Sequence, residues 1–124
     1  EWGKCFDDDL RSLVWLGDSL KRVREFPAEV RREIGVALYD AQKGDTSPDA
    51  KPFKGVGSGV FEIVTRFHTD TYRSVYAVQI GASVYVLHAF QKKAKRGIKT
   101  PQQDVDLIKR RYRQAVDLKK EAGP

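Results

Sequence analysis

Three runs rich in β-branched and aromatic residues follow one another in the second half of the chain, at residues 60–67, 72–80 and 83–90. The tetrapeptide HTDT separates the first two runs, and the dipeptide GA separates the last two. Strand-forming residues interrupted by such short polar or glycine-containing turns are typical of antiparallel hairpins. We therefore predict an antiparallel meander, which other elements must cover.

The residues ahead of the meander predict one strand and two helices. Residues 10–16 (LRSLVWL) form a short apolar run. Asp18 or Ser19 can cap a helix that ends before Pro27, because the residue preceding a proline avoids the helical region. Apolar residues then recur at helical spacing over residues 26–41, with charged residues mainly on the opposite side. These two segments are expected to form a helical hairpin.

A loop and a final helix complete the expected order. Residues 43–59 contain six glycines and prolines and are predicted to be loop. Residues 100–103 (TPQQ) match a capping box with proline at the first helical position. The order β-α-α-β-β-β-α predicts an α+β fold, an antiparallel sheet with helices packed on one face. We expect an N-terminal extension at 1–9, a single domain at 10–118 and a C-terminal tail at 119–124.

Length and composition exclude several classes of protein. A chain of 124 residues with 40% hydrophobic residues has the size and content of one globular domain. Cys5 is the only cysteine, which excludes a disulfide scaffold. No apolar run approaches the roughly 18 residues of a membrane span, and we recognise no signal peptide. We expect a cytoplasmic protein with no membrane partner.

Positive charge is concentrated in the later part of the chain. The net charge is +6, but residues 1–50 hold 8 basic and 11 acidic residues, whereas residues 51–124 hold 15 and 6. Such asymmetry favours a face that binds a polyanion, with a merely soluble basic surface as the alternative.

The meander predicts which polar side chains share a face. If Phe67 pairs with Tyr72 and Ile80 pairs with Ser83, alternation places one polar set together. That set is Glu62, Arg66, Arg73 and His88. The opposite face, which the helices would bury, carries Phe61, Ile63, Phe67, Tyr76, Val78, Leu87 and Ala89. A slip of one residue at either turn would break this clustering.

Basic segments flank the polar face and predict an RNA-binding surface. Residues 91–99 contain five cations, and Phe53 and Phe90 lie nearby for base stacking. The predicted RNA-binding residues are Lys51, Lys54, Arg66, His88, Phe90, Lys92, Lys95 and Arg96. The alternatives are a solvated turn at 91–99, a surface ion pair between the arginines and Glu62, and a histidine satisfied by a neighbour.

The chemistry that this face could perform needs no cofactor and no metal. The sequence has no metal-ligand spacing, phosphate-binding loop or nucleophile elbow, and its GVGSG segment precedes a strand rather than a helix. RNA supplies its own nucleophile, the 2′-hydroxyl, so a protein needs only a base, an acid and cations. Glu62, Arg73 and a lysine would suffice.

The element order and three motifs resemble the RelE/ParE toxin superfamily, in its HigB-like, phage-related branch. The motifs are residues 72–76 (YRSVY), residues 86–93 (VLHAFQKK) and the Thr100-Pro101 step, and the similarity spans about residues 13–116. The resemblance implies a toxin of a type II toxin–antitoxin system that cuts mRNA on the ribosome without a metal. ParE-like members instead poison DNA gyrase, and a phage protein that binds RNA without cutting it is a further alternative.

The resemblance also implies roles for individual residues. Glu62 lies where some relatives place a glutamate base, Arg73 matches the arginine that stabilises the scissile phosphate, and Lys93 falls where a basic residue aids the leaving group. Lys51 and Lys54 would contact mRNA or ribosomal RNA. Val64 replaces an arginine found in many relatives, and no tyrosine matches the C-terminal catalytic tyrosine of RelE. The implied partners are the ribosome, mRNA and an antitoxin carrying a helix-turn-helix domain.

Overall fold

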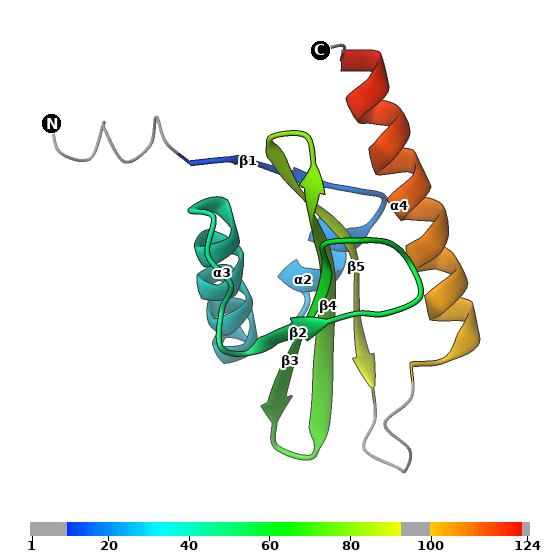
Figure 1. The fold of residues 1–124 in the computed structure, drawn as a ribbon. Helices are drawn as coiled ribbons and strands as arrows, with labels where there is room; N and C mark the ends of the chain where they lie inside the picture. The colour runs from blue at the N-terminus through cyan, green and yellow to red at the C-terminus, as the bar shows by residue number, and fades with distance from the viewer. Residues whose placement is uncertain (1–9, 93–99, 123–124) are drawn as a thin grey trace, which may run out of the picture.

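The structure is a computed structural model, and it describes residues 10–92 and 100–122 (Figure 1). It has the mixed α+β character that the sequence predicts. In chain order the elements are β1 (Ser12–Trp15), α2 (Ser19–Arg24), α3 (Ala28–Gln42), β2 (Ala50–Pro52), β3 (Val60–Phe67), β4 (Asp70–Ile80), β5 (Ser83–Lys92) and α4 (Gln102–Ala122). The expected N-terminal extension, residues 1–9, lies outside the described residues. Helix α4 runs past residue 118, where the domain was expected to end.

The five strands form one sheet in the order β1-β5-β4-β3-β2. The meander is confirmed, because β3, β4 and β5 pair antiparallel with their neighbours in sequence, whereas β1 pairs parallel with β5. Strand β2 was not predicted and lies inside the segment expected to be loop. It has only three residues, too few to show the alternation by which a strand is recognised in a sequence. It pairs with Phe61–Ile63 of β3.

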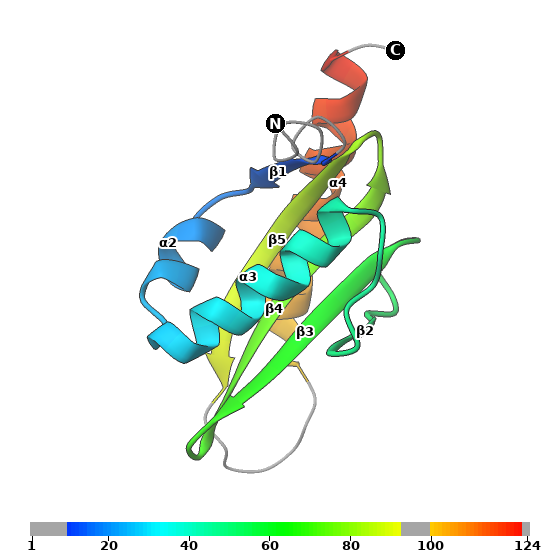
Figure 2. The same ribbon diagram turned by 90° about the vertical axis from the view of Figure 1, so that its left-hand side faces the viewer.

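The helices cover both faces of the sheet, and the expectation that they share one face is wrong. Helices α2 and α3 pack on the face that carries Ile63, Tyr76 and Val86. Helix α4 packs on the other face, where its Ile108 and Ala115 meet a second buried cluster. Figure 2 shows α3 in front of the strands and α4 behind them. The physical reason is that β4 and β5 are buried almost continuously, which requires cover on both sides.

The first turn of the meander is tighter than predicted. Phe67 pairs with Asp70, not with Tyr72, and the two-residue turn places His68 at a φ of 59°. The error in register is two residues. Because side chains alternate with a period of two, the same residues still share each face.

The second turn has the predicted pairing, with Ile80 opposite Ser83, but an irregularity follows it. Tyr76 pairs with Val86 and Val75 pairs with His88, so Leu87 is an extra residue in β5. Leu87 therefore lies on the α4 face, and its predicted place on the α3 face is wrong.

Local sequence signals position the helices. Helix α3 begins directly after Pro27, and the residues that it buries recur at the predicted helical spacing: Val30, Ile34, Ala37, Leu38 and Ala41. Helix α4 begins after Pro101, whose carbonyl accepts hydrogen bonds from the backbone N–H groups of Asp104 and Val105. Of the helices in the described ranges, none combines the length and apolar content that crossing a membrane requires.

Candidate functional site: a polar face beside α4

Three rows of paired residues cross the α4 face of the sheet. The first row runs from Lys51 through Glu62 and Val75 to His88. The second row is Val64, Arg73 and Phe90, and the third is Arg66, Thr71 and Lys92. Paired residues point to the same side of a sheet, so four strands bring these side chains together. The second and third rows lie toward the β3–β4 turn, which extends past the first turn of α4 (Figure 1).

An ion pair between Glu62 and Arg73 lies at the centre of this face. Arg73 Nη1 donates to Glu62 Oε1 over 2.8 Å, and the two side chains are only 10% and 13% exposed. The partners come from adjacent strands and from neighbouring rows, so they meet diagonally. A carboxylate and a guanidinium are thereby held in contact at a site that is largely screened from water.

Lys92, at the end of β5, lies close enough to this ion pair for both of its members to affect the lysine pKa. Burial lowers the pKa of Lys92 below its usual 10.5, the Arg73 guanidinium lowers it further, and the Glu62 carboxylate opposes the change. The side chain is half-buried and two residues beyond Phe90, on the same face. A lysine in such surroundings releases its proton more readily than a solvated one.

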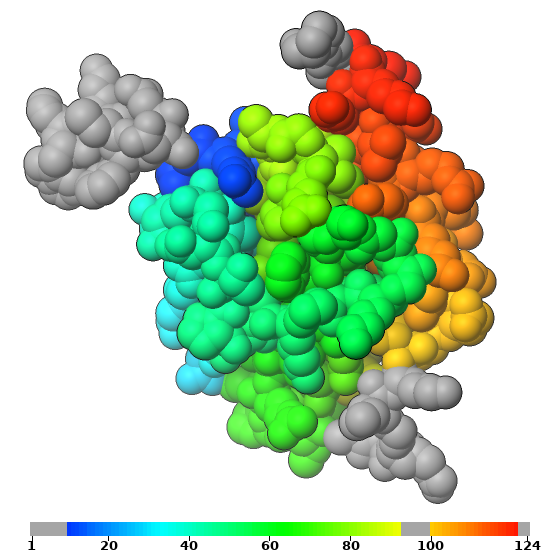
Figure 3. Space-filling model, in the orientation of Figure 1, coloured from blue at the N-terminus to red at the C-terminus, as the bar shows by residue number. Residues whose placement is uncertain are grey.

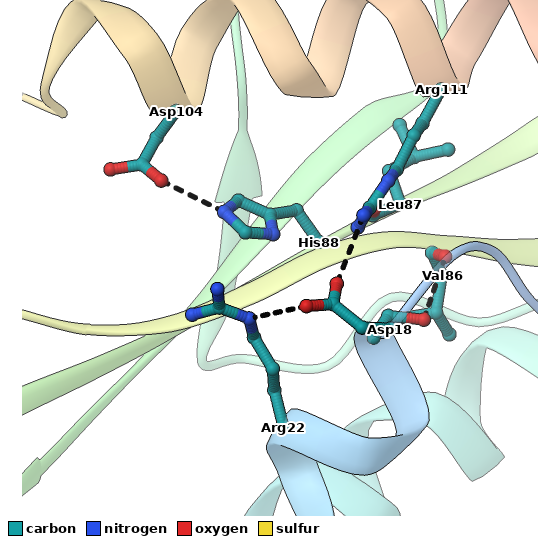
Figure 4. Close-up of polar contacts among 8 residues, drawn as sticks. Asp18, Arg22, Val86, Leu87, His88, Asp104 and Arg111 are labelled. Carbon is teal, nitrogen blue, oxygen red and sulfur yellow. Dashed lines mark hydrogen bonds and ion pairs between the residues drawn. The ribbon is translucent and has the colours of Figure 1, made fainter.

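His88 joins β5 to the first turn of α4. Its Nε2 donates to Asp104 Oδ1 over 2.8 Å (Figure 4). The His88 ring also stacks on that of Phe90, with the centroids 5.1 Å apart. Burial lowers the pKa of His88 from 6.5, the hydrogen bond to Asp104 opposes this, and Arg111 and Arg22 add to the lowering. The imidazole is therefore neutral at pH 7. Within the described residues, its Nδ1 is buried with no hydrogen-bond partner.

A second polar network fastens α4 to α2 across β5. Asp18 accepts from Arg22 Nε and from Arg111 Nη2, each over 2.9 Å, and Arg111 Nη1 donates to the carbonyl of Leu87 over 3.0 Å (Figure 4). The hydrogen bond from Arg22, together with Arg111, lowers the pKa of Asp18 from 3.8 to about 2 against the opposing effect of burial. This network fixes the rotation of α4 about its axis.

The predicted site residues divide into four groups by location. Glu62, Arg73 and Lys92 come together as described, and Lys51 and Arg66 are exposed at the ends of the rows. His88 and Phe90 are 1% and 5% exposed, so neither presents its side chain to a ligand in this arrangement. Lys54 is exposed in the loop before β3. Lys93, Lys95 and Arg96 lie outside the described residues.

Several polar residues of the site were not predicted from the sequence. Asp104 and Arg111 were not among the predicted site residues. Both contacts depend on how α4 docks on β5, which no local pattern encodes. Among the described residues, no three histidine, cysteine or acidic side chains gather as metal ligands would.

Comparison with known proteins gives one finding. No curated protein and no solved structure matches the chain significantly. The family model described as "Phage derived protein Gp49-like (DUF891)" matches residues 21–113, which span α3, the whole sheet except β1, and more than half of α4. This is a RelE/toxin-like family. The matched part contains the Glu62–Arg73 pair, Lys92, and His88 with Asp104. Because the match covers most of the chain, the protein belongs to the phage-derived Gp49-like family.

Proposed function

We propose that this chain is a toxin that cleaves mRNA on the ribosome by using the 2′-hydroxyl of the RNA as the nucleophile. The observation that carries the proposal is the 2.8 Å contact between the Glu62 carboxylate and the Arg73 guanidinium, two groups whose chemistry suits a general base and a cation that binds phosphate. Lys51 lies directly opposite Glu62, and Lys92 lies close enough for both members of the pair to act on its pKa. RNA cleavage of this kind requires that combination of groups.

In the proposed reaction, the Glu62 carboxylate takes the proton of the 2′-hydroxyl as the 2′-oxygen attacks the adjacent phosphorus. The bond from phosphorus to the 5′-oxygen breaks, which leaves a 2′,3′-cyclic phosphate on one fragment. The departing 5′-oxygen takes a proton from a lysine ammonium and becomes a 5′-hydroxyl. Arg73 stabilises the extra negative charge on the phosphorane-like transition state. Exchange with solvent returns Glu62 and the lysine to their starting states.

The Glu62–Arg73 contact also suggests how the substrate would prepare the base. Without RNA, the guanidinium of Arg73 donates to the carboxylate of Glu62. A scissile phosphate offers Arg73 a second anionic acceptor and shifts the guanidinium toward itself. The carboxylate would then be left next to the 2′-hydroxyl, able to accept its proton.

The lysine that protonates the leaving group was expected to be Lys93. Its neighbour Lys92 has two features of such an acid, namely a place beside Arg73 and a pKa lowered by burial and by the Arg73 charge. An acid works best when its pKa is near the working pH, so a lowered value favours the role. We assign the role to Lys92, with Lys93 as the neighbouring cation on the RNA.

Membership of a RelE/toxin-like family supports the rest of the proposal. The ribosome would present the mRNA, and an antitoxin with a helix-turn-helix domain would hold the toxin inactive. The antitoxin takes no part in the proposed chemistry of Glu62 and Arg73, so its binding can be tested separately from cleavage.

The test is cleavage of a defined mRNA in a reconstituted translation reaction, with 5′ ends mapped by primer extension. We expect Glu62→Gln and Arg73→Lys to lower the cleavage rate by about 100-fold or more, because each removes a group that acts in the transition state. Arg32→Gln, which removes an exposed cation from α3 on the opposite face of the sheet, is the control and should leave the rate close to that of wild type.

Thermal melts of all variants separate loss of chemistry from loss of fold. Cleavage by folded Glu62→Gln and Arg73→Lys at the wild-type rate would contradict the assignment. A wild-type protein that leaves mRNA intact but induces a DNA-damage response in cells would indicate gyrase inhibition instead.

A further inference from the structure

Helix α4 exposes a row of cations on its outer surface, here called the α4 ridge and defined as Lys109, Arg110 and Arg113. All three side chains are exposed. The helix carries no acidic residue between Asp106 and Asp117, so the ridge is a local concentration of positive charge. None of its residues belongs to the polar face around Glu62 and Arg73.

The orientation of the ridge is set by contacts on the inner side of the helix. Arg111 turns inward, where it binds Asp18 and the carbonyl of Leu87. Ile108 and Ala115 are fully buried against the sheet. The remaining cations of this helical turn must therefore face outward, in a fixed position relative to the sheet.

A groove runs between the ridge and the loop that precedes β3. It has a volume of about 460 Å³ and is lined by Gly55, Val56, Lys109, Tyr112, Arg113 and Val116. The backbone of Gly57 packs directly on the Tyr112 ring, since a Cβ added there would overlap it. Figure 3 shows the loop and α4 meeting on one surface of the molecule. Lys54, immediately before Gly55, is exposed beside this groove.

The loop connects the ridge to the polar face. It begins at the end of β2, where Lys51 pairs with Glu62, and reaches α4 at Gly57. Exposed cations therefore continue from Lys51 through Lys54 to Lys109 and Arg113. Among the residues that the structure describes, none of these four cations forms an ion pair within the chain. Each is available to an anion from outside.

We propose that the α4 ridge and the loop groove bind the phosphate backbone of RNA at a second site, separate from the Glu62–Arg73 pair. A single anion would need one or two cations, whereas a track of cations over two elements fits a polymer with regularly spaced charges. Tyr112 in the groove offers a ring surface beside the cations, a combination that suits single-stranded RNA. The choice of RNA as the ligand rests on the proposed function.

The second site has a defined task in this scheme. It supplies affinity and orients the strand, while the Glu62–Arg73 pair performs the chemistry. Loss of the ridge should therefore weaken RNA binding and raise KM, with little change in kcat.

The test compares two double variants that remove the same charge. Lys109→Gln/Arg113→Gln removes one lysine and one arginine from the ridge, and Lys21→Gln/Arg24→Gln removes one of each from α2, on the opposite face of the sheet. Binding of a fluorescent single-stranded RNA of about 20 nucleotides is measured by anisotropy across a salt series. Each phosphate contact on single-stranded RNA contributes about 0.7 to the slope of log K against log salt, so the ridge variant should lower the slope by about 1.4. Its Kd at low salt should rise about tenfold or more, and the α2 variant should stay close to wild type.

Three results would overturn the proposal. They are an unchanged slope in the ridge variant, an equal loss in the α2 variant, and a wild-type protein that does not bind RNA, which would leave the ridge as a surface for an acidic protein. The proposed chemistry is judged apart from this, because Arg73→Lys should lower the cleavage rate by about 100-fold or more and keep the salt slope. RNA binding that depends on the ridge, in a protein that cleaves nothing, would support the second site and refute the nuclease.

Discussion

The Glu62–Arg73 pair makes a quantitative prediction about stability. Its side chains are 10% and 13% exposed, so water cannot replace a missing partner in place. Removing one member of a buried ion pair typically costs about 3–5 kcal/mol, whereas replacing both by apolar residues is often close to neutral. Because Glu62 is slightly exposed, we expect a cost at the low end of this range. We expect Arg73→Met to lower the free energy of unfolding by about 3 kcal/mol, and Glu62→Leu/Arg73→Met to remain within about 1 kcal/mol of wild type.

Urea denaturation followed by tryptophan fluorescence measures this difference. A protein of this size has an m value of about 1–2 kcal/mol/M, so the single variant should unfold at a urea concentration lower by about 2 M. Arg66→Met is the control, because an exposed cation contributes within about 0.5 kcal/mol. A double variant as unstable as Arg73→Met would refute the reasoning, since the cost would then come from lost packing and not from an unpaired carboxylate.

Two further predictions concern the contacts that hold α4. The folded pKa of Asp18, about 2, lies below its ordinary 3.8, so its contribution to stability is present above pH 4 and is lost as the pH falls toward 2. Linkage gives about 2.5 kcal/mol, and solvent screening at a side chain that is 42% exposed reduces this to about 1 kcal/mol. Asp18→Asn should therefore be less stable than wild type at pH 7 and equal to it near pH 2, and a difference that persists at pH 2 would contradict the electrostatic origin. Gly57→Ala should destabilise the protein by about 1–3 kcal/mol, because the added Cβ would overlap the Tyr112 ring. Gly55 has a φ of 92° but open space around it, so Gly55→Asn should lower the stability by less in the same thermal melt. Equal losses of stability in the two variants would show that the loop does not press on α4.

The meander and the shared polar face were predictable because both depend on alternation. The turn before β4 was misplaced by two residues, yet Glu62, Arg66 and Arg73 kept their common side. The side of the sheet on which a residue lies depends only on alternation along the strand, and a register error of two residues leaves it unchanged. The sequence pattern therefore specifies the side better than it specifies the exact pairing.

Which helix packs on which face of the sheet could not be predicted in the same way. Residues 72–77 and 84–90 are buried without interruption, which is the pattern of strands enclosed on both faces. That pattern was interpreted as alternation, and α4 was placed with the other helices. The His88–Asp104 contact and the exposed α4 ridge follow from the actual side on which α4 packs, so they were not predicted either.

The meander also contains two departures from regular pairing that cancel each other. Strand β5 carries one extra residue at Leu87, and β4 carries one extra residue between Ala77 and Ile80, so the sheet returns to its original pairing at Val75 and His88. Val86 faces α3, whereas Leu87 and His88 both lie on the α4 side, so the extra residue places two neighbouring side chains on one face. Deleting Leu87 alone would restore strict alternation, and His88, Phe90 and Lys92 would keep their side of the sheet. The cost of such a deletion would therefore fall on the docking of α4, because Arg111 Nη1 donates to the carbonyl of Leu87 and the Leu87 side chain packs in the cluster beneath this helix.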